Sequence, residues 1–288
     1  MARILKARLL INVSSVPHMQ QIYDLKRFHS IDYSIQDTYI LPTTEKIRPF
    51  FGCVKYFVNK CSINKYDYII PTSDIFNRVI YALNKKYNLP GIKTEQIANA
   101  VSLKDVYYDI FGKLNIPCPK VYQIFDSNKN IEYDKIKYPC IIKPVHGTAG
   151  IGVKILFNEE QLIQHIETLY FNEKKILTVN DFEIELFNHE RYLIQEYISG
   201  EVCSAMGFVY KGKIQIDFMH DIFPPSGQYP VELHFSGPSS YTNKINNIII
   251  EYLNKFFKHI RLHTCPFMID MIIRSEEHTS ELQSHVRI

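Results

Sequence analysis

Apolar stretches and helix-like patterns alternate over the first 92 residues of the chain. Apolar runs predict strands at 8–13, 33–41 and 68–71, and apolar residues at helical spacing predict helices at 18–28, 45–58 and 75–87. Strands that alternate with helices are typical of a parallel sheet covered by helices. The sequence therefore predicts an α/β domain over residues 1–92.

This domain is not predicted to hold a dinucleotide. A Rossmann-type cofactor site needs a glycine-rich turn directly after the first strand, where the backbone approaches the pyrophosphate. The first glycine of the chain is Gly52, far beyond the predicted strand at 8–13. A nicotinamide-dependent oxidoreductase is therefore disfavoured, and the domain is expected to act as a support or a substrate platform.

After residue 92 the pattern changes and strands dominate. Residues 93–114 predict one or two helices, which end before Pro117 because proline cannot continue a helix. Further strands are predicted at 121–125, 139–143, 153–157, 192–197, 203–210, 214–219 and 267–273, and further helices at 158–170 and 243–259. A tight turn over residues 210–213 is predicted to join two of these strands as a hairpin, so this part is expected to be α+β.

Composition excludes several other classes of protein. With 46% hydrophobic and 22% charged residues, the chain has an ordinary globular composition. A net charge of +3 argues against nucleic acid as the main partner, and no apolar run reaches the roughly 18 residues of a membrane helix. The start of the chain shows no signal-peptide pattern. The six cysteines form no C-x-x-C pair, which favours buried thiols in the cytoplasm over zinc ligands or disulfides.

The densest group of glycines follows the predicted strand at 139–143. Glycine lets backbone N–H groups converge on an anion, and Lys143 directly precedes the loop. The segment is not a P-loop, because Val153 stands where that motif has lysine and a strand follows where it has a helix. The sequence predicts a strand–loop–strand flap over phosphates, with an ordinary hairpin turn as the alternative.

Three motifs in order resemble the ATP-grasp superfamily. They are Ile141-Ile142-Lys143-Pro144 with the glycines after it, the hinge-like segment 195–201, and the strand 268–273. The resemblance covers roughly residues 68–273. It implies a pre-ATP-grasp domain at 1–92 and an ATP-grasp domain at 93–273, with antiparallel sheets in a small lobe at 118–197 and in an incomplete C-terminal lobe at 198–273.

The resemblance also implies a site for ATP and Mg²⁺. Lysines and the glycine flap would bind the phosphates, the hinge would line the adenine pocket, an acid after it would bind the ribose, and an aspartate would bind the metal. The lysines would be Lys104 and Lys143, and the flap would contribute His146, Gly147, Thr148, Gly150 and Gly152. The hinge residues would be Gln195, Glu196, Tyr197 and Ile198, the ribose acid Glu201, and the metal ligand Asp270. Leu103 replaces the aspartate that the family usually carries before its first lysine.

The function implied is that of a ligase. It would activate a small-molecule carboxylate as an acyl phosphate for attack by an amine or similar nucleophile, in a Mg²⁺-dependent reaction, without nucleic acid or membrane partners. His220, His234 and Arg261 are candidate substrate contacts. Met268 stands where dipeptide ligases carry a cation, which disfavours a D-alanine ligase-like specificity. A non-catalytic ATP-binding module is the alternative, and a homodimer is left open.

The last residues have a different character from the rest. Residues 274–288 resemble the translation of a sequencing adapter, and we expect them to be a non-native tail. The family completes its metal site with a glutamate and an asparagine on the strand that would follow here. The chain as written is therefore expected to lack these ligands and to be inactive.

Overall fold

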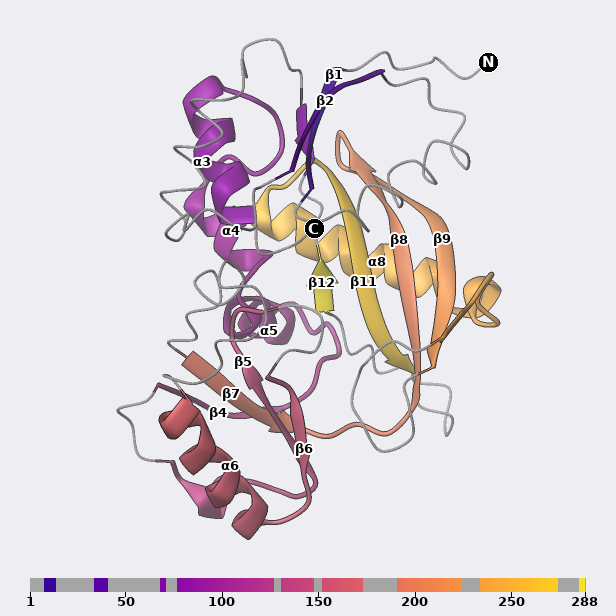
Figure 1. Ribbon diagram of the computed structural model, residues 1–288. Coiled ribbons are helices and arrows are strands. Elements are labelled where there is room, and N and C mark those ends of the chain that lie inside the picture. The colour runs from indigo at the N-terminus through magenta and orange to yellow at the C-terminus, as the bar shows by residue number, and fades with distance from the viewer. Residues whose placement is uncertain are drawn as a thin grey trace.

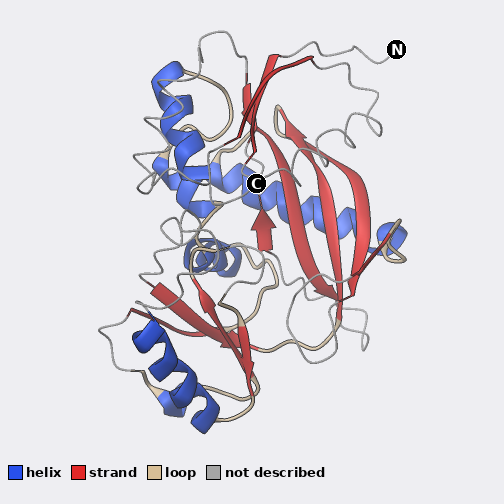
Figure 2. Ribbon diagram, in the orientation of Figure 1, coloured by secondary structure: helices blue, strands red, loops and turns tan. Residues whose placement is uncertain are grey.

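A computed structural model gives the arrangement of the chain (Figure 1). It describes residues 8–13, 34–40, 68–70, 77–126, 131–147, 152–172, 191–223, 234–273 and 285–287. Strands form three separate sheets, and helices lie on or between them (Figure 2).

The first sheet is parallel, as predicted. It contains β1 (Arg8–Val13), β2 (Ser34–Ile40) and β3 (Tyr68–Ile70) in the order β2-β1-β3, and α3 (Asn77–Tyr87) follows it. The predicted helices at 18–28 and 45–58 lie outside the described residues. A hydrogen bond joins this sheet to the large sheet: the Tyr68 hydroxyl donates to the Thr264 carbonyl at 2.9 Å. Burial raises the pKa of Tyr68, so the hydroxyl keeps the proton that it donates.

The second, small sheet is antiparallel. It contains β4 (Val121–Asp126), β5 (Cys140–Pro144), β6 (Lys154–Leu156) and β7 (Arg191–Glu196) in the order β4-β7-β5-β6. A short 3-10 turn (Tyr133–Lys135) precedes β5, and α6 (Glu159–Asn172) packs Leu162 and Ile166 onto Ile142 and Ile194 of the sheet. Because side chains alternate along a strand, Lys143 and Leu193 belong to the opposite face, away from α6.

The third, large sheet is also antiparallel. It contains β8 (Glu201–Tyr210), β9 (Lys213–Phe223), β10 (His234–Ser236), β11 (Thr264–Ile273) and β12 (His285–Arg287) in the order β10-β9-β8-β11-β12. The predicted turn between β8 and β9 is confirmed, with positive φ at Lys211 and Gly212. The apolar face of α8 (Thr242–Ile260), including Ile249 and Phe257, packs with Ile269 and Met271 of β11.

Two short helices connect the sheets. They are α4 (Glu95–Ala100) and α5 (Lys104–Lys113), where the sequence allowed one helix or two. The buried side of α5 belongs to the core of α8 and the large sheet, and Phe111 meets Phe256 at 5.1 Å between ring centroids. In Figure 1, α5 lies between the small sheet and α8. It therefore contacts both halves of the molecule.

Two strands were not predicted. Neither β10 nor β12 exceeds three residues, so too few positions are present to show a period. β12 belongs to the predicted tail and pairs with Met268–Asp270 of β11. The other residues of the tail, 274–284 and 288, lie outside the described residues. Within the described part of the chain, no helix is both long and apolar enough to cross a bilayer.

Gly207 of β8 lies where the large sheet leaves no room for a side chain. A Cβ on Gly207 would press on the carbonyl oxygen of Gln215 and lie 2.9 Å from Cα of Ile216, at a point where the register of β8 and β9 shifts. Gly207→Ala should therefore lower the free energy of unfolding by about 1–3 kcal/mol, measured by urea denaturation.

Gly112→Ala is the matched control. Apart from its chain neighbours and the backbone of its own helix, no heavy atom of the described residues lies within 4 Å of the added Cβ, and the position is in α5, so this variant should gain about 0.5–1 kcal/mol. Equal effects of the two substitutions would contradict the close approach of β8 and β9 at Gly207.

Candidate functional site

The side chain of Lys143 lies inside the protein. The preceding Cys140-Ile141-Ile142 run makes β5 buried along its whole length, and Lys143 itself is 0% exposed. Its Nζ donates a hydrogen bond to the Tyr108 hydroxyl at 2.9 Å and lies 5.2 Å from the centre of that ring. Burial first, and the like charge of Lys104 second, hold the pKa of Lys143 well below its usual value. This is an unusual setting for a lysine, because ammonium groups are rarely buried so fully.

Lys104 is the second buried lysine of the site. It begins α5, is 8% exposed, and its Nζ donates to the Gly147 carbonyl at 2.8 Å. Its backbone N–H donates to the Val145 carbonyl at 3.0 Å. Main chain and side chain of Lys104 therefore both hold the segment that leads from β5 into the glycine loop.

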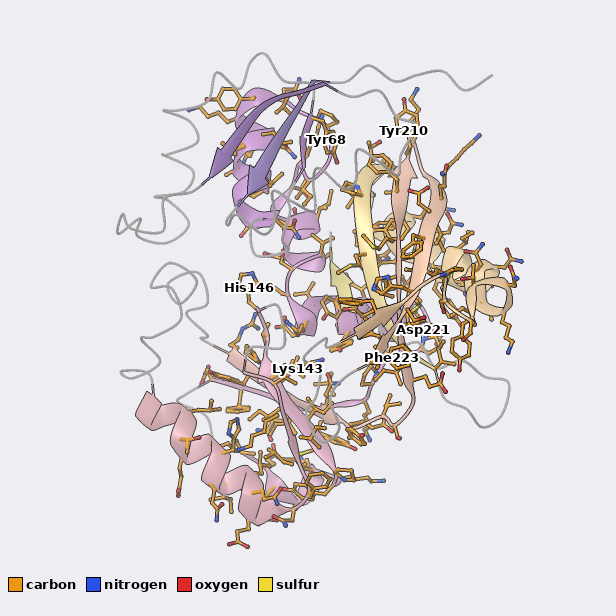
Figure 3. All side chains as sticks on the ribbon, turned by 45° about the vertical axis from the view of Figure 1, so that its right-hand side comes forward. Tyr68, Lys143, His146, Tyr210, Asp221 and Phe223 are labelled. Carbon is orange, nitrogen blue, oxygen red and sulfur yellow. The ribbon has the colours of Figure 1, made fainter. Side chains whose placement is uncertain are left out.

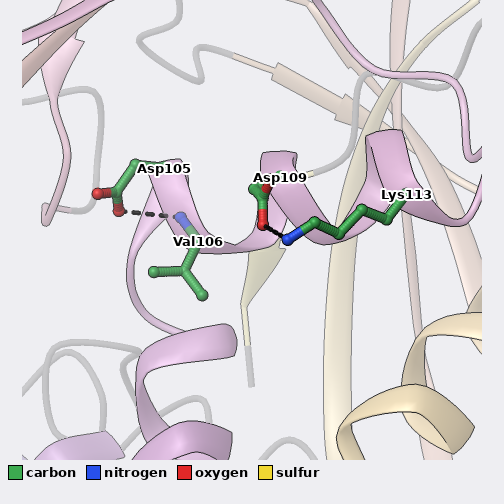
Figure 4. Close-up of polar contacts among 4 residues, drawn as sticks. All are labelled: Asp105, Val106, Asp109 and Lys113. Carbon is green, nitrogen blue, oxygen red and sulfur yellow. Dashed lines mark hydrogen bonds and ion pairs between the residues drawn. The ribbon is translucent and has the colours of Figure 1, made fainter.

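Asp105, the residue after Lys104, stabilises the start of α5. Leu103 occupies the N-cap, where its apolar side chain accepts no hydrogen bond. Instead, Asp105 accepts from the Val106 N–H at 2.9 Å (Figure 4) and from Arg191 of β7 at 2.5 Å. The Asp105 side chain is 9% exposed, whereas Asp109 and Lys113, the other ion pair of this helix, are 59% and 64% exposed.

The glycine loop is only partly described. The strand–loop–strand arrangement is confirmed, since β5 and β6 pair as antiparallel neighbours. Gly152 has φ +73°, and a Cβ there would lie 2.9 Å from Cγ of Pro144, so both conformation and space favour glycine. His146 is half-buried and lies with Lys143 on the side of the small sheet turned toward the large sheet (Figure 3). Thr148 and Gly150 lie outside the described residues.

The predicted hinge leaves the small sheet at the end of β7. The Glu196 N–H donates to the Lys120 carbonyl at 2.9 Å, which closes the pairing with β4. Tyr197 is half-buried and Ile198 is buried. A Cβ on Gly200 would press on the Ile273 carbonyl, so the hinge reaches the large sheet beside the end of β11.

Gln195 presents a buried polar group in this region. Its side chain is 0% exposed, and within the described residues neither its amide nitrogen nor its amide oxygen has a hydrogen-bond partner. The register places it opposite Ile141, on the face that carries Lys143. A buried amide without partners costs roughly 1–3 kcal/mol, so this position favours a bound polar group.

Glu201 and Asp270 do not share a face of the large sheet. Glu201 pairs with Ile273, whose side chain belongs to the core on the α8 side, and the Glu201 carboxylate accepts from the Tyr241 hydroxyl at 2.7 Å. This hydrogen bond raises the pKa of Tyr241 to about 12. Asp270 alternates with the core residues Ile269 and Met271 and therefore belongs to the other face.

Asp270 lies in a row of polar residues across the large sheet. It is 8% exposed and stands opposite Ser204 of β8, which in turn stands opposite His220 of β9. A carboxylate oxygen is a ligand that Mg²⁺ accepts, and one or two carboxylates plus phosphate oxygens suffice for it. The described residues contain no group of three or more acids, histidines and cysteines able to hold a metal, so Asp270 would be one ligand among others.

The candidate substrate contacts lie on three different elements. His220 packs against the rings of Phe218 and Phe235 at 5.8 and 5.1 Å between centroids. Of His234 the structure describes the backbone, as the first residue of β10. Arg261 is exposed at the C-cap of α8, at the end of β11 away from Asp270. Arg261 therefore lies at the other end of the large sheet from His220, which stands opposite Ser204.

Sequence reasoning missed Tyr108 and Asp105. Both lie on α5 close to Lys104, and Tyr108 follows it by four residues, the spacing that puts two side chains on one helix face. A tyrosine has many packing roles, however, so the spacing alone does not single it out. The geometry that results is two buried lysines, Lys104 bonded to the start of the glycine loop and Lys143 bonded to Tyr108 on the same helix, with the Asp270 carboxylate on the large sheet.

Comparison with known proteins gives a family match. Residues 136–283, about half of the chain, match the family model of the ATP-grasp domain. The chain is 33% identical over 91 residues to the alpha-aminoadipate–LysW ligase LysX of Saccharolobus solfataricus, a match covering 31% of this chain and 29% of that protein. It is 31% identical over 119 residues to the D-alanine–D-alanine ligase of Wolbachia pipientis wMel, covering 41% of this chain and 31% of that protein. The matches thus span about a third of the length of these curated relatives.

A solved structure shares the fold. It is the biotin carboxylase domain dimer of Hydrogenobacter thermophilus 2-oxoglutarate carboxylase in complex with MgADP, ADP and bicarbonate. The TM-score is 0.69 and the identity 15%, and the match covers 99% of this chain and 64% of that chain. The mixed fold with antiparallel sheets that was predicted for this chain is therefore confirmed.

Two aspartates of α5 allow a comparison between a buried carboxylate that anchors the helix and an exposed carboxylate on its surface. Asp105→Asn should lower the free energy of unfolding by about 1.5–3 kcal/mol, because a charged acceptor of two hydrogen bonds is lost. Asp109→Asn removes an exposed pair and should cost at most about 0.5 kcal/mol. Urea denaturation of both variants gives the comparison, and equal losses would show that Asp105 does not anchor α5 to β7.

Proposed function

Because the chain belongs to the ATP-grasp domain family, we propose that it binds ATP at the start of the glycine loop and uses it to join a carboxylate to an amine or a similar nucleophile. The observation that carries the proposal is the pair of buried lysines. Lys143 is fully buried, and the like charge of Lys104 is one of the influences that lower its pKa. Two like charges in a poorly solvated site favour a polyanion, because an anion offsets both their burial and their repulsion.

The adenine would lie beside the hinge. Gln195 supports this placement, since within the described residues its buried amide lacks the donor and acceptor that the edge of a base would provide. The half-buried Tyr197 and the buried Ile198 would add apolar contacts. The predicted role of Glu201 at the ribose requires its carboxylate to exchange or share the bond from Tyr241.

The metal would be Mg²⁺ held in part by Asp270. Its buried carboxylate supplies a hard oxygen, and ATP phosphates and water would supply the other ligands. When bound, the cation neutralises phosphate charge and lowers the barrier to phosphoryl transfer. Asp270, Lys104 and Lys143 would orient the triphosphate, and no side-chain nucleophile is required for such a transfer.

The reaction class follows from what the relatives are named for. One is named as a ligase of alpha-aminoadipate and LysW and the other as a ligase of two D-alanines, and we propose that this chain joins a carboxylate to an amine or a similar nucleophile. The carboxylate oxygen would attack the γ-phosphorus of ATP, and ADP would leave. The nucleophile would then attack the acyl carbon, and phosphate would leave. The acid and the nucleophile are not identified by any residue described above.

The domain organisation is part of the proposal. We assign residues 1–92 to a pre-ATP-grasp domain, 93–273 to the ATP-grasp domain with lobes at 118–197 and 198–273, and 274–288 to a non-native tail. The parallel first sheet and the two antiparallel sheets support this division. The cytoplasmic location remains a prediction of the sequence, and a homodimer remains open.

A non-catalytic ATP-binding module is the second candidate. Asp270 is one carboxylate, and the described residues hold no larger acidic cluster that could complete a metal site. Release of phosphate from ATP that depends on both an added carboxylic acid and an added amine would favour the ligase. Tight ATP binding without such release would favour the module, and would agree with the expected inactivity of the chain as written.

Lys143→Ala tests the phosphate site. Loss of the buried ammonium should weaken ATP binding by more than about tenfold, or ~1.4 kcal/mol, in isothermal titration calorimetry. Lys113→Ala, which removes an exposed lysine of α5, is the control and should leave the affinity unchanged. An unaltered affinity in folded Lys143→Ala protein would remove the main assignment.

Asp270→Asn tests the metal ligand. In the unsubstituted protein, MgCl₂ should strengthen ATP binding. The substitution should make this gain in affinity about tenfold smaller, because the amide oxygen is a neutral, weaker ligand. Asp217→Asn, on the exposed part of β9, is the control. The idea fails if the gain from MgCl₂ persists in Asp270→Asn while Lys143→Ala still weakens binding.

A further inference from the structure

Tyr108 is not in any of the sequence motifs, yet it holds the buried lysine. It is 4% exposed, and its hydroxyl accepts the 2.9 Å hydrogen bond from Lys143 Nζ. At 5.2 Å from the ring centre, the amine lies beyond the hydroxyl edge of the ring and not over its face, so the hydrogen bond is the contact that acts on it. This bond favours the charged amine over the neutral one, because an ammonium is the stronger donor.

The helix that carries Tyr108 is fixed at both ends. Its start is tied to the small sheet through Lys104 and through the pair of Asp105 with Arg191. Its buried side is packed against the other half of the molecule, where Phe111 meets Phe256. The position of the Tyr108 hydroxyl is therefore set by packing that does not depend on Lys143.

We propose that Tyr108 is a positioning residue that keeps the amine of Lys143 charged and aimed for the phosphates of the nucleotide. This inference rests on the proposed ATP site. The lysine side chain has many rotamers, and fixing it in advance removes part of the entropy cost of binding. The hydroxyl acts through Lys143 and is not placed in contact with the nucleotide.

The charges around Lys143 define what pH should do. From α5 it faces Tyr108 and the like-charged Lys104, and from β7 it faces the apolar Leu193. His146 follows three residues later, at the start of the loop. Because burial and Lys104 lower the pKa of Lys143, raising the pH should discharge the amine and weaken ATP binding. Loss of the Tyr108 hydroxyl removes a partner of the charged form and should move this weakening to lower pH.

The test compares Tyr108→Phe with Tyr107→Phe, a neighbouring buried tyrosine of the same helix. ATP affinity in the presence of MgCl₂ is measured by calorimetry from about pH 7.5 to 9.5, above the ~6 pKa of a terminal phosphate. Tyr108→Phe should bind ATP about tenfold more weakly at pH 7.5, with its pH profile displaced to lower pH. Tyr107→Phe should retain the profile of the unsubstituted protein. An undisplaced profile in Tyr108→Phe overturns the inference.

A double-mutant cycle keeps the test independent of stability. If Tyr108 acts through Lys143, Tyr108→Phe should have no further effect on affinity in a Lys143→Met background. Additive losses would mean that Tyr108 acts by another route and would overturn the inference. If Lys143→Met itself leaves the affinity unchanged, the proposed ATP site fails. If it weakens binding and Tyr108→Phe does not, only the role of Tyr108 fails.

Discussion

The burial of two lysines of like charge at one point is the constraint on which the site depends. Lys143 is the penultimate residue of β5, a strand that is buried along its length, and Lys104 begins α5 and donates to Gly147 in the loop that follows β5. Each ammonium costs free energy when it leaves water, and each makes the other costlier. The hydroxyl of Tyr108 and the carbonyl of Gly147 offset part of this cost. Such a site is stabilised further by any anion that reaches it.

Helix α5 makes this arrangement possible because it belongs to both halves of the protein. Its polar first turn is bonded to the small sheet, and its apolar side is part of the core of the large one. A change in the distance between the sheets would therefore strain either the bonds of this first turn or the packing of Phe111 on Phe256. The place of Lys104 and Tyr108 beside Lys143 thus depends on contacts outside the site as well as within it.

The sequence predicted most of the fold because its signals are local. Apolar runs such as Cys140–Pro144 and helix patterns such as Thr242–Ile260 carry their own period, and the turn at Lys211 and Gly212 requires positive φ. The pairing between distant residues is not local. Nothing in the sequence shows that Tyr108 meets Lys143, that Asp105 meets Arg191, or that Tyr241 donates to Glu201. These contacts arise from tertiary packing, and they decide the charge and direction of the site residues.

Strand alternation explains why motifs predict which residues gather and not how they point. Glu201 and Asp270 are three register positions apart, yet an odd separation puts their side chains on opposite faces of the sheet. Glu201 is the first residue of β8, directly after Gly200 of the hinge. For both acids to serve one nucleotide, the first residue of β8 must rotate away from Tyr241 toward the face of Asp270. In the proposed site, the Glu201–Tyr241 bond is therefore the contact that the ribose would have to break or share.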